Sequence, residues 1–160
     1  MDKQFLIDQL ASRIRESVQV AMREHEAAAQ EAREGATPSE KRDDARVALE
    51  FSNLAKAQGR RANAALDELA TIEAFHPSKT SSRVSVGNVV EIEDGDLGRT
   101  IFLAPAGAGI ELTMPDGDGF VTVVTPASPL GKVIMGCRVG DSVEVAVKGE
   151  EREWTVTFIA

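Results

Sequence analysis

The stretch that decides the fold is residues 121–145, with the sequence VTVVTPASPLGKVIMGCRVGDSVEV. Valine recurs at every second position at both of its ends, which is the pattern of a half-buried β-strand. Between these ends the alternation stops. There Ser128 suits a helix N-cap and Pro129 suits the first helical position. The stretch therefore predicts a short helix over 128–136 that lies between two strands.

Strand patterns continue outward from this stretch through the second half of the chain. Residues 77–160 hold 11 glycines and five prolines, a composition that favours short strands and turns. We therefore expect a small twisted β domain with one short helix, whose core is modest at this size. The further strand patterns are 89–92, 101–103 and, after a turn around 148–150, the alternating Trp154, Val156 and Phe158.

The first half of the chain has the opposite composition. Residues 1–76 hold 16 alanines and a single proline, which favours helix. Gly35 suits a helix C-cap, and Thr37, Pro38 and Glu40 then form the start of a second helix with a capping box. So short a break predicts an antiparallel hairpin, with arms roughly 50 Å long at 1.5 Å per residue. The heptad seam positions are Ile7, Leu10, Ile14, Ser17 or Val18, Ala21, Ala28 and Ala32, then Phe51, Ala55, Gln58, Ala62, Ala65, Leu69 and Ile72.

Length and charge limit the class of protein. The chain has 160 residues, with 18 basic and 26 acidic side chains and a net charge of −8. Such a chain does not neutralise phosphates, so stable binding to free DNA or to an anionic membrane is not expected. The single cysteine, Cys137, excludes an internal disulfide and a cysteine-based zinc site, and it fits a reducing cytoplasm. No signal peptide or membrane span is expected.

Few residues suggest enzyme chemistry. The sequence has no Ser–His–Asp order, metal-ligand spacing or phosphate-binding loop. His25 lies among glutamates and is predicted to be a solvated helix residue, whereas His76 is predicted to cap the second helix. Arg138 could lower the pKa of Cys137, although a small packing residue is the favoured interpretation of this cysteine.

The acidic residues that could carry chemistry lie at the predicted hairpin tip. Glu40, Asp43 and Asp44 are three and four positions apart and share a helix face. Carboxylates there could help to hold Mg²⁺ in the active site of another protein. The alternative is that they only stabilise the first turn of the helix, with Glu40 in its capping box.

The central stretch resembles the C-terminal domain of the GreA/GreB transcript cleavage factors. The family pattern S-P-x-G-(K/R)-x-(L/I)-x-G-x-x-x-G-D is matched from Ser128 to Asp141. Residues 84–90 resemble the start of that domain, and residues 101–107 resemble a divergent Gre-like branch. Residues 50–59 look like the family's descending helix.

The resemblance implies an accessory factor and not an enzyme. In the family, an FKBP-like C-terminal domain docks on the β′ coiled coil at the rim of the secondary channel of bacterial RNA polymerase. The hairpin then enters the channel, where two tip acids in an Asp-x-x-Glu pattern help the polymerase to hold a second Mg²⁺ and cleave backtracked RNA. The resemblance assigns polymerase contact here to Ser128, Pro129, Leu130, Gly131 and Lys132.

The hairpin tip departs from the family pattern. Alignment on residues 50–51 places the family's aspartate at Asp44 and its glutamate at Val47, which cannot bind a metal. Glu40 and Asp43 have the same spacing in a shifted register. Two functions therefore stay open. In the first, Glu40, Asp43 and Asp44 assist cleavage, and the two aspartates share Mg²⁺ with the polymerase. In the second, the chain is a regulator that competes with Gre factors and does not stimulate cleavage. A remote alternative, an FKBP-like isomerase or chaperone, rests on fold analogy.

The predicted organisation is an α+β chain in three parts. An antiparallel coiled-coil hairpin spans 1–76 with its tip near 35–44, a linker spans 77–83, and an FKBP-like Gre C-terminal domain spans 84–160. We expect a cytoplasmic monomer that has no cofactor of its own and whose partner is RNA polymerase.

Overall fold

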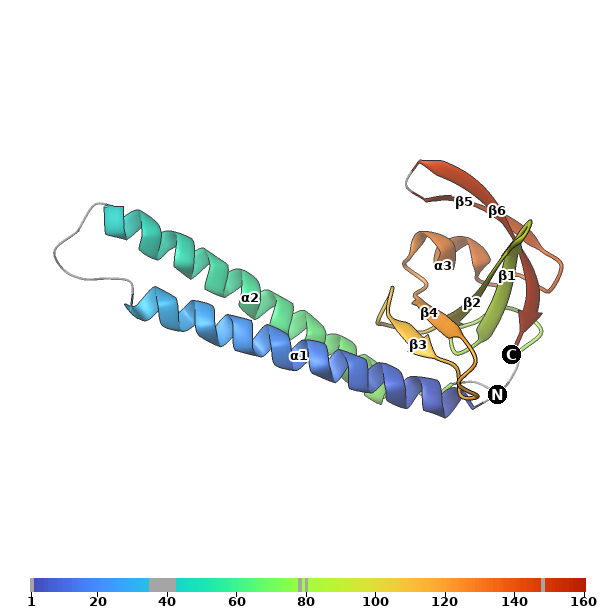
Figure 1. Ribbon diagram of the computed structural model, residues 1–160, viewed down its shortest axis with the longest axis horizontal. Coiled ribbons are helices and arrows are strands. Elements are labelled where there is room, and N and C mark those ends of the chain that lie inside the picture. Colours follow the sequence, from blue (N-terminus) through green and yellow to red (C-terminus); the bar gives the residue numbers. More distant parts are fainter. Residues whose placement is uncertain (1, 35–42, 78, 80, 148) are drawn as a thin grey trace. The chain divides into compact units, whose positions relative to one another are not determined.

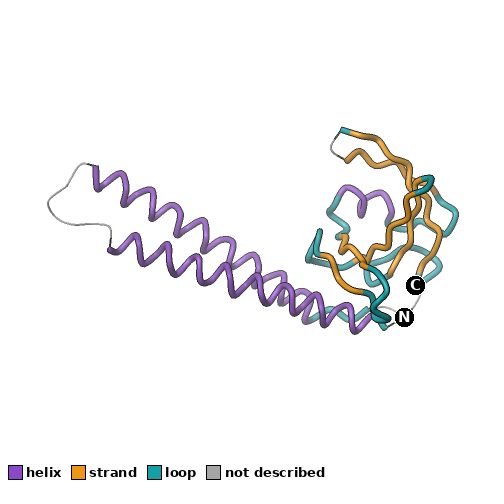
Figure 2. Tube along the Cα trace, in the orientation of Figure 1, coloured by secondary structure: helices purple, strands orange, loops and turns teal. Residues whose placement is uncertain are grey.

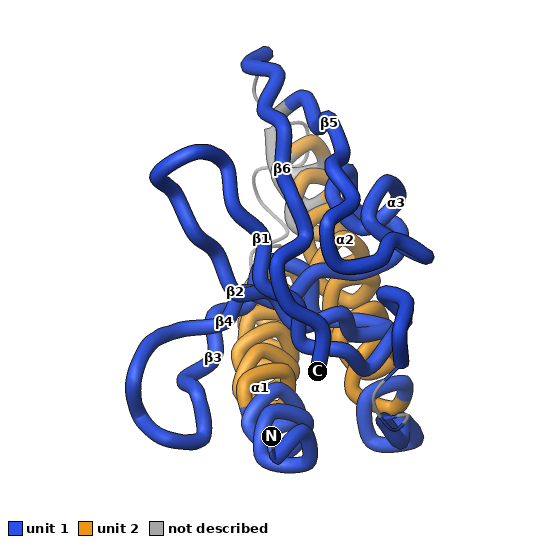
Figure 3. Tube along the Cα trace, turned by 90° about the vertical axis from the view of Figure 1, so that its right-hand side faces the viewer, with its two compact units in different colours: residues 1–12, 71–160 blue, residues 13–70 orange. Residues whose placement is uncertain are grey.

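The computed structural model describes residues 2–34, 43–77, 79, 81–147 and 149–160. Within them, two long helices precede a six-stranded sheet that carries one short helix (Figure 1). The chain divides into two compact units, residues 13–70 and residues 1–12 with 71–160 (Figure 3). The elements are α1 (Lys3–Glu34), α2 (Asp43–Glu73), β1 (Val89–Asp94), β2 (Leu97–Leu103), β3 (Glu111–Thr113), β4 (Phe120–Val124), α3 (Pro129–Ile134), β5 (Ser142–Val147) and β6 (Glu150–Ile159).

In the unit of residues 13–70, α1 and α2 lie side by side and run in opposite directions (Figure 2). The predicted seam is buried at Ile14, Val18, Ala28 and Ala62. Helix α1 ends at Glu34, and the predicted cap residues Gly35, Thr37, Pro38 and Glu40 all lie outside the described residues. None of the helices that the structure describes is both long and apolar enough to cross a membrane.

The six strands form one mixed sheet in the order β3-β4-β2-β1-β6-β5. Strands β2 and β4 pair in parallel, whereas the other neighbours are antiparallel. The five predicted strands are present, and so is the helix between β4 and β5. Strand β3 is an addition, because three residues are too few to show an alternating pattern. The predicted class, a helical hairpin followed by a small β domain with one short helix, is confirmed.

The core of the β domain lies between the sheet and α3. Ile134 of α3 and the inward residues of β1, β2, β5 and β6 form one buried cluster. Phe158, which the alternation with Val156 places in this core, is instead 44% exposed. The β1–β6 register shifts between Glu91 and Ile92, which pair with Phe158 and Val156. This β-bulge adds one residue to β6, so that Phe158 moves to the other face of the sheet.

The base of α1 belongs to the same unit as the strands. Leu6 and Leu10 are fully buried in this unit, and so is Ile72 of α2. The Gln9 side chain bonds to edge strand β3 as a further strand would: Oε1 accepts from the Thr113 N–H at 2.7 Å, and Nε2 donates to the Thr113 carbonyl at 3.3 Å. These two bonds cover the outer backbone edge of β3 at this residue.

Candidate functional site

The predicted contact segment, residues 128–132, forms the start of α3. Ser128 is the N-cap: its Oγ accepts from the Gly131 N–H at 3.1 Å and donates to the Thr125 carbonyl at 2.7 Å. Pro129 is the first helical residue, where its missing N–H costs nothing. The predicted cap is confirmed, although the helix ends at Ile134 and is shorter than expected.

Gly131 lies where α3 passes very close to the preceding loop. A Cβ at this position would collide with the Thr125 carbonyl oxygen and would stand 2.9 Å from Ser128 Oγ. The glycine therefore permits the approach on which the Ser128 cap depends.

The rest of the motif also serves backbone geometry. Gly136 and Gly140 have φ values of 81° and 94°, which side chains rarely tolerate. The Gly140 N–H donates to the Val156 carbonyl at 2.8 Å, which joins the turn to β6. One carboxylate oxygen of Asp141 accepts from the Arg138 N–H at 2.8 Å and closes the turn.

With the backbone fixed in this way, α3 presents a small surface. Pro129 and Lys132 are exposed, whereas Leu130 is half-buried against the core of the β domain. Ser128 and Gly131 hold the turn, which presents the side chains of Pro129, Leu130 and Lys132. Contact of residues 128–132 with a partner stays a prediction.

A cleft of about 600 Å³ lies beside Leu130, and nothing in the sequence analysis predicted it. Trp154 and Val145 line it from the core, and Leu97, Arg99 and Arg152 line it further out. The Arg99 guanidinium carbon lies 5.5 Å from the centroid of the Trp154 ring, within range of a cation–π interaction.

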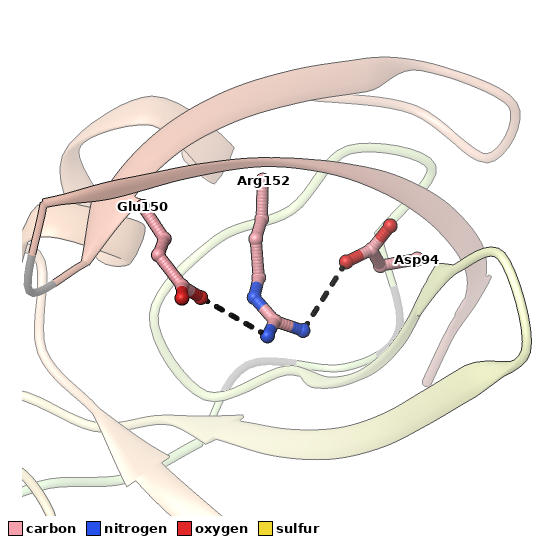
Figure 4. A network of polar contacts seen from close by, with 3 residues as sticks. All are labelled: Asp94, Glu150 and Arg152. Atoms are coloured by element: carbon pink, nitrogen blue, oxygen red, sulfur yellow. Dashed lines mark hydrogen bonds and ion pairs between the residues drawn. The ribbon is translucent and has the colours of Figure 1, made fainter.

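Arg152 of the cleft has two carboxylate partners, of which Glu150 also lines the cleft. Its guanidinium lies 3.5 Å from Asp94 and 3.4 Å from Glu150, between the two side chains (Figure 4). The sequence gives only a weak signal that these residues share a face of the sheet. Residues two positions apart on a strand lie on the same face, and Arg152 is two positions from Trp154, as Arg99 is from Ile101.

Residues 79–160, just over half of the chain, match the family described as Transcription elongation factor, GreA/GreB, C-term. The chain belongs to the GreA/GreB family of transcription elongation factors. The match includes α3, its cap and the cleft, and it confirms the family that the Ser128–Asp141 motif indicated.

Several solved structures are similar to this Gre-family chain over most of its length. The transcription factor Gfh1 has 23% identity, a TM-score of 0.41 and coverage of 94% of this chain and 93% of its own. GreA factor homolog 1 of Thermus thermophilus has 19% identity, a TM-score of 0.38 and 94% coverage of each chain. A GreA/GreB factor from Nitrosomonas europaea has 14% identity, a TM-score of 0.35 and coverage of 71% and 90%. No curated protein matches the sequence.

In this Gre-family factor Cys137 is a packing residue. Its side chain packs against the core of the β domain, and Sγ lies 3.5 Å from the Val133 carbonyl. Burial raises the pKa of the Cys137 thiol, and the negative charge of Asp141 raises it further. The suggestion that Arg138 lowers this pKa is therefore wrong, whereas the packing interpretation fits the structure.

The two histidines differ in their surroundings. His25 was predicted to be solvated, but it is half-buried. Its Nδ1 lies 2.9 Å from the Ala55 carbonyl, and its ring lies against Gly59. Its spacing from Ala21 and Ala28 places it on the helix seam, a signal that its charged neighbours obscured. His76 is exposed just beyond α2, with Nδ1 3.1 Å from the Ala74 carbonyl, which suits the predicted cap.

The predicted tip acids fall where the structure does not describe the side chains. Glu40 lies outside the described residues, and the side chains of Asp43 and Asp44, at the start of α2, lie outside them as well. Over the part of the chain that is described, no group of three or more His, Cys, Asp or Glu residues is placed to hold a metal ion. The assignment of Glu40, Asp43 and Asp44 therefore stays a prediction.

Proposed function

We propose that this chain is an accessory factor that binds bacterial RNA polymerase in the cytoplasm, with α3 against the β′ coiled coil at the rim of the secondary channel. The observation that carries the proposal is the start of α3, where the Ser128 cap and the close approach at Gly131 hold a turn that presents Pro129, Leu130 and Lys132. A turn that is already ordered loses little conformational entropy when it binds. Membership of the GreA/GreB family supports polymerase as the kind of partner.

The proposal extends to the hairpin tip. In it, Glu40, Asp43 and Asp44 assist the polymerase in cleaving backtracked RNA, and the two aspartates share an Mg²⁺ ion with the enzyme. Carboxylate oxygens are ligands that Mg²⁺ prefers, and the ion would stabilise charge on the oxygens of the phosphodiester. The chain itself acts as a monomer without a cofactor of its own.

One observation favours a second candidate function. Val47 occupies the position where the family has its tip glutamate, and an aliphatic side chain cannot bind a metal. The chain would then occupy the channel and compete with Gre factors without stimulating cleavage.

RNA cleavage in halted, backtracked elongation complexes distinguishes the two candidates. The chain is added alone and together with a Gre factor of known activity, and a triple Glu40→Ala, Asp43→Ala, Asp44→Ala variant is compared with a Glu24→Ala, Glu26→Ala variant of exposed α1 glutamates. Cleavage that only the tip variant abolishes supports the cleavage factor. Suppression of the known factor without cleavage supports the regulator. If the chain neither stimulates cleavage nor suppresses the known factor, the result contradicts docking itself.

A further inference from the structure

The two edges of the sheet differ in how the fold treats them. At one edge β3 has only three residues, and the Gln9 side chain bonds to both backbone groups of Thr113. At the other edge β5 spans six residues, with β6 on one side and, in the described part of the chain, no strand on the other (Figure 1). All six residues pair with β6 in one continuous register. Their sequence, SVEVAV, contains neither proline nor lysine, the residues that commonly protect an edge. This edge is therefore open to a further strand.

The bonding pattern of β5 shows which of its backbone groups point outward. Just before the strand, the Val156 N–H donates to the Asp141 carbonyl at 2.9 Å. Because bonded pairs alternate along an antiparallel ladder, the next residues that bond to β6 lie two and four positions beyond Asp141. The residues between them direct their N–H and C=O groups away from β6, and these are Ser142, Glu144 and Ala146. Within the described residues, the structure gives these outward groups no partner.

The outer face of the β5–β6 pair carries negative charge without a positive counterpart. Glu144 lies directly opposite Glu153, and on the same face Glu151 lies opposite Ala146. The three glutamates, which we call the acidic face, are exposed, and none has a basic partner among the residues that the structure describes. Like charges in directly opposite positions destabilise a pair of strands, so this arrangement does not serve the stability of the sheet. Positive side chains on an added strand would offset the repulsion.

We propose that the open edge of β5 binds an extended segment of a partner protein in which lysine or arginine alternates with apolar residues. The segment pairs antiparallel with β5, the more stable of the two directions, and exchanges hydrogen bonds with the outward backbone groups of Glu144 and Ala146. Its basic side chains lie opposite these two residues, on the side of the acidic face. Its apolar side chains lie on the other side of the sheet, beside Val143.

A second copy of this chain fits the edge less well than a basic segment does. Pairing of β5 with its own copy would place two acidic faces on one side of the joined sheet, where like charges oppose association. The net charge of −8 acts in the same direction. Charge therefore favours a basic partner. The inference goes beyond the proposed function, because neither α3 nor RNA polymerase takes part in it.

The first test uses peptides and leaves the protein unaltered. The probe is a fluorescein-labelled, amidated lysine–valine–lysine–valine–lysine peptide, and its binding to the full chain is followed by fluorescence anisotropy. In the antiparallel register the central lysine directs its N–H at β5, whereas the valine N–H groups point away. N-methylation of the central lysine is therefore expected to raise Kd about fivefold or more, and N-methylation of one valine less than about twofold. The same peptide with glutamate in place of lysine is expected not to bind.

The second test alters the edge. Ala146→Pro removes an outward N–H and keeps the bonds to β6, because proline is tolerated where the N–H of an edge strand faces solvent. It is expected to raise the Kd of the lysine peptide about fivefold or more, whereas Ala146→Ser, which keeps the N–H, changes it less than about twofold. Glu144→Gln with Glu153→Gln is expected to raise Kd about threefold or more. Glu24→Gln with Glu26→Gln, which removes the same charge from exposed residues of α1, is the control. Thermal melting shows whether each variant keeps its fold.

The outcomes separate this inference from the proposed function. Equal Kd values for the two N-methylated peptides would overturn strand pairing, and so would equal values for Ala146→Pro and Ala146→Ser. Self-association in sedimentation velocity that Ala146→Pro abolishes would place a second copy on the edge and overturn the basic partner. If the lysine peptide binds as expected while the chain fails to bind RNA polymerase, the proposed function fails and the inference stands.

Discussion

At Gly131 the chain leaves no room for a side chain, because α3 begins directly beneath the Thr125 carbonyl. The same carbonyl accepts the Ser128 hydroxyl, so displacing it would also disturb the helix cap. Ser128 and Gly131 therefore fix the backbone at the start of α3, and their contact with a partner stays a prediction.

A methyl group at this position is expected to destabilise the β domain. The substitution Gly131→Ala forces the loop and the helix apart, and overpacking of this kind costs about 1–3 kcal/mol of unfolding free energy. Urea denaturation measures the loss, with Lys132→Ala, an exposed neighbour on the same helix, as the control. An unfolding free energy for Gly131→Ala as high as that of the control would contradict the close approach.

The Cys137 thiol gives a pH-dependent prediction at the same scale. Burial and the Asp141 carboxylate both disfavour the thiolate and raise the pKa, and only the thiolate reacts with an alkylating agent. The rate of alkylation by iodoacetamide is therefore expected to rise with pH, with a midpoint above that of free cysteine.

Replacing Asp141 by asparagine separates the two causes. The variant removes the negative charge but keeps an oxygen that can accept from the Arg138 N–H, so the midpoint is expected to fall part of the way towards that of free cysteine. A midpoint that does not move on this substitution would show that the carboxylate has no influence on the thiol.

Among the elements, α1 and edge strand β3 are joined by two hydrogen bonds of the Gln9 side chain. Gln9→Ala removes the acceptor of the Thr113 N–H. Because a net hydrogen bond contributes about 1 kcal/mol, the Thr113 amide is expected to exchange roughly fivefold faster in this variant. Hydrogen exchange at Thr113 measures the effect. Gln4→Ala is the matched control, because Gln4 lies exposed on the same helix and its side chain bonds to Asp8. Equal protection of Thr113 in the two variants would contradict this role of Gln9.

Local patterns predicted most of these elements. The heptad spacing on α1, the alternation in β1 and the Ser128–Pro129 start of α3 are each contained in a few consecutive residues. Strand β3 and the bulge that exposes Phe158 were not predicted, because both depend on pairing with another strand.

Less of the candidate site than of the fold could be predicted from the sequence. The cleft takes its lining from β2, α3, β5 and β6, so no single stretch of sequence marks it. The contact segment was identified because its motif is continuous, and the position of its cap follows from Ser128 and Pro129 alone.

At the scale of the whole molecule, the features that carry the proposed docking all lie in one unit. Helix α3, its cap and the cleft belong to the unit of residues 1–12 and 71–160, and the family match spans 79–160. The unit of residues 13–70 carries the arms of the hairpin and the predicted tip acids. Docking and cleavage can therefore be tested separately, and docking is the central claim.

Gel filtration of the chain with core RNA polymerase tests that claim most directly. Two polymerases are compared at micromolar concentration, one intact and one that lacks the tip of the β′ coiled coil. The chain is expected to co-migrate with the intact enzyme and to elute alone with the truncated one. Equal co-migration with both polymerases would contradict docking on the coiled coil, and no co-migration with either would contradict polymerase binding altogether.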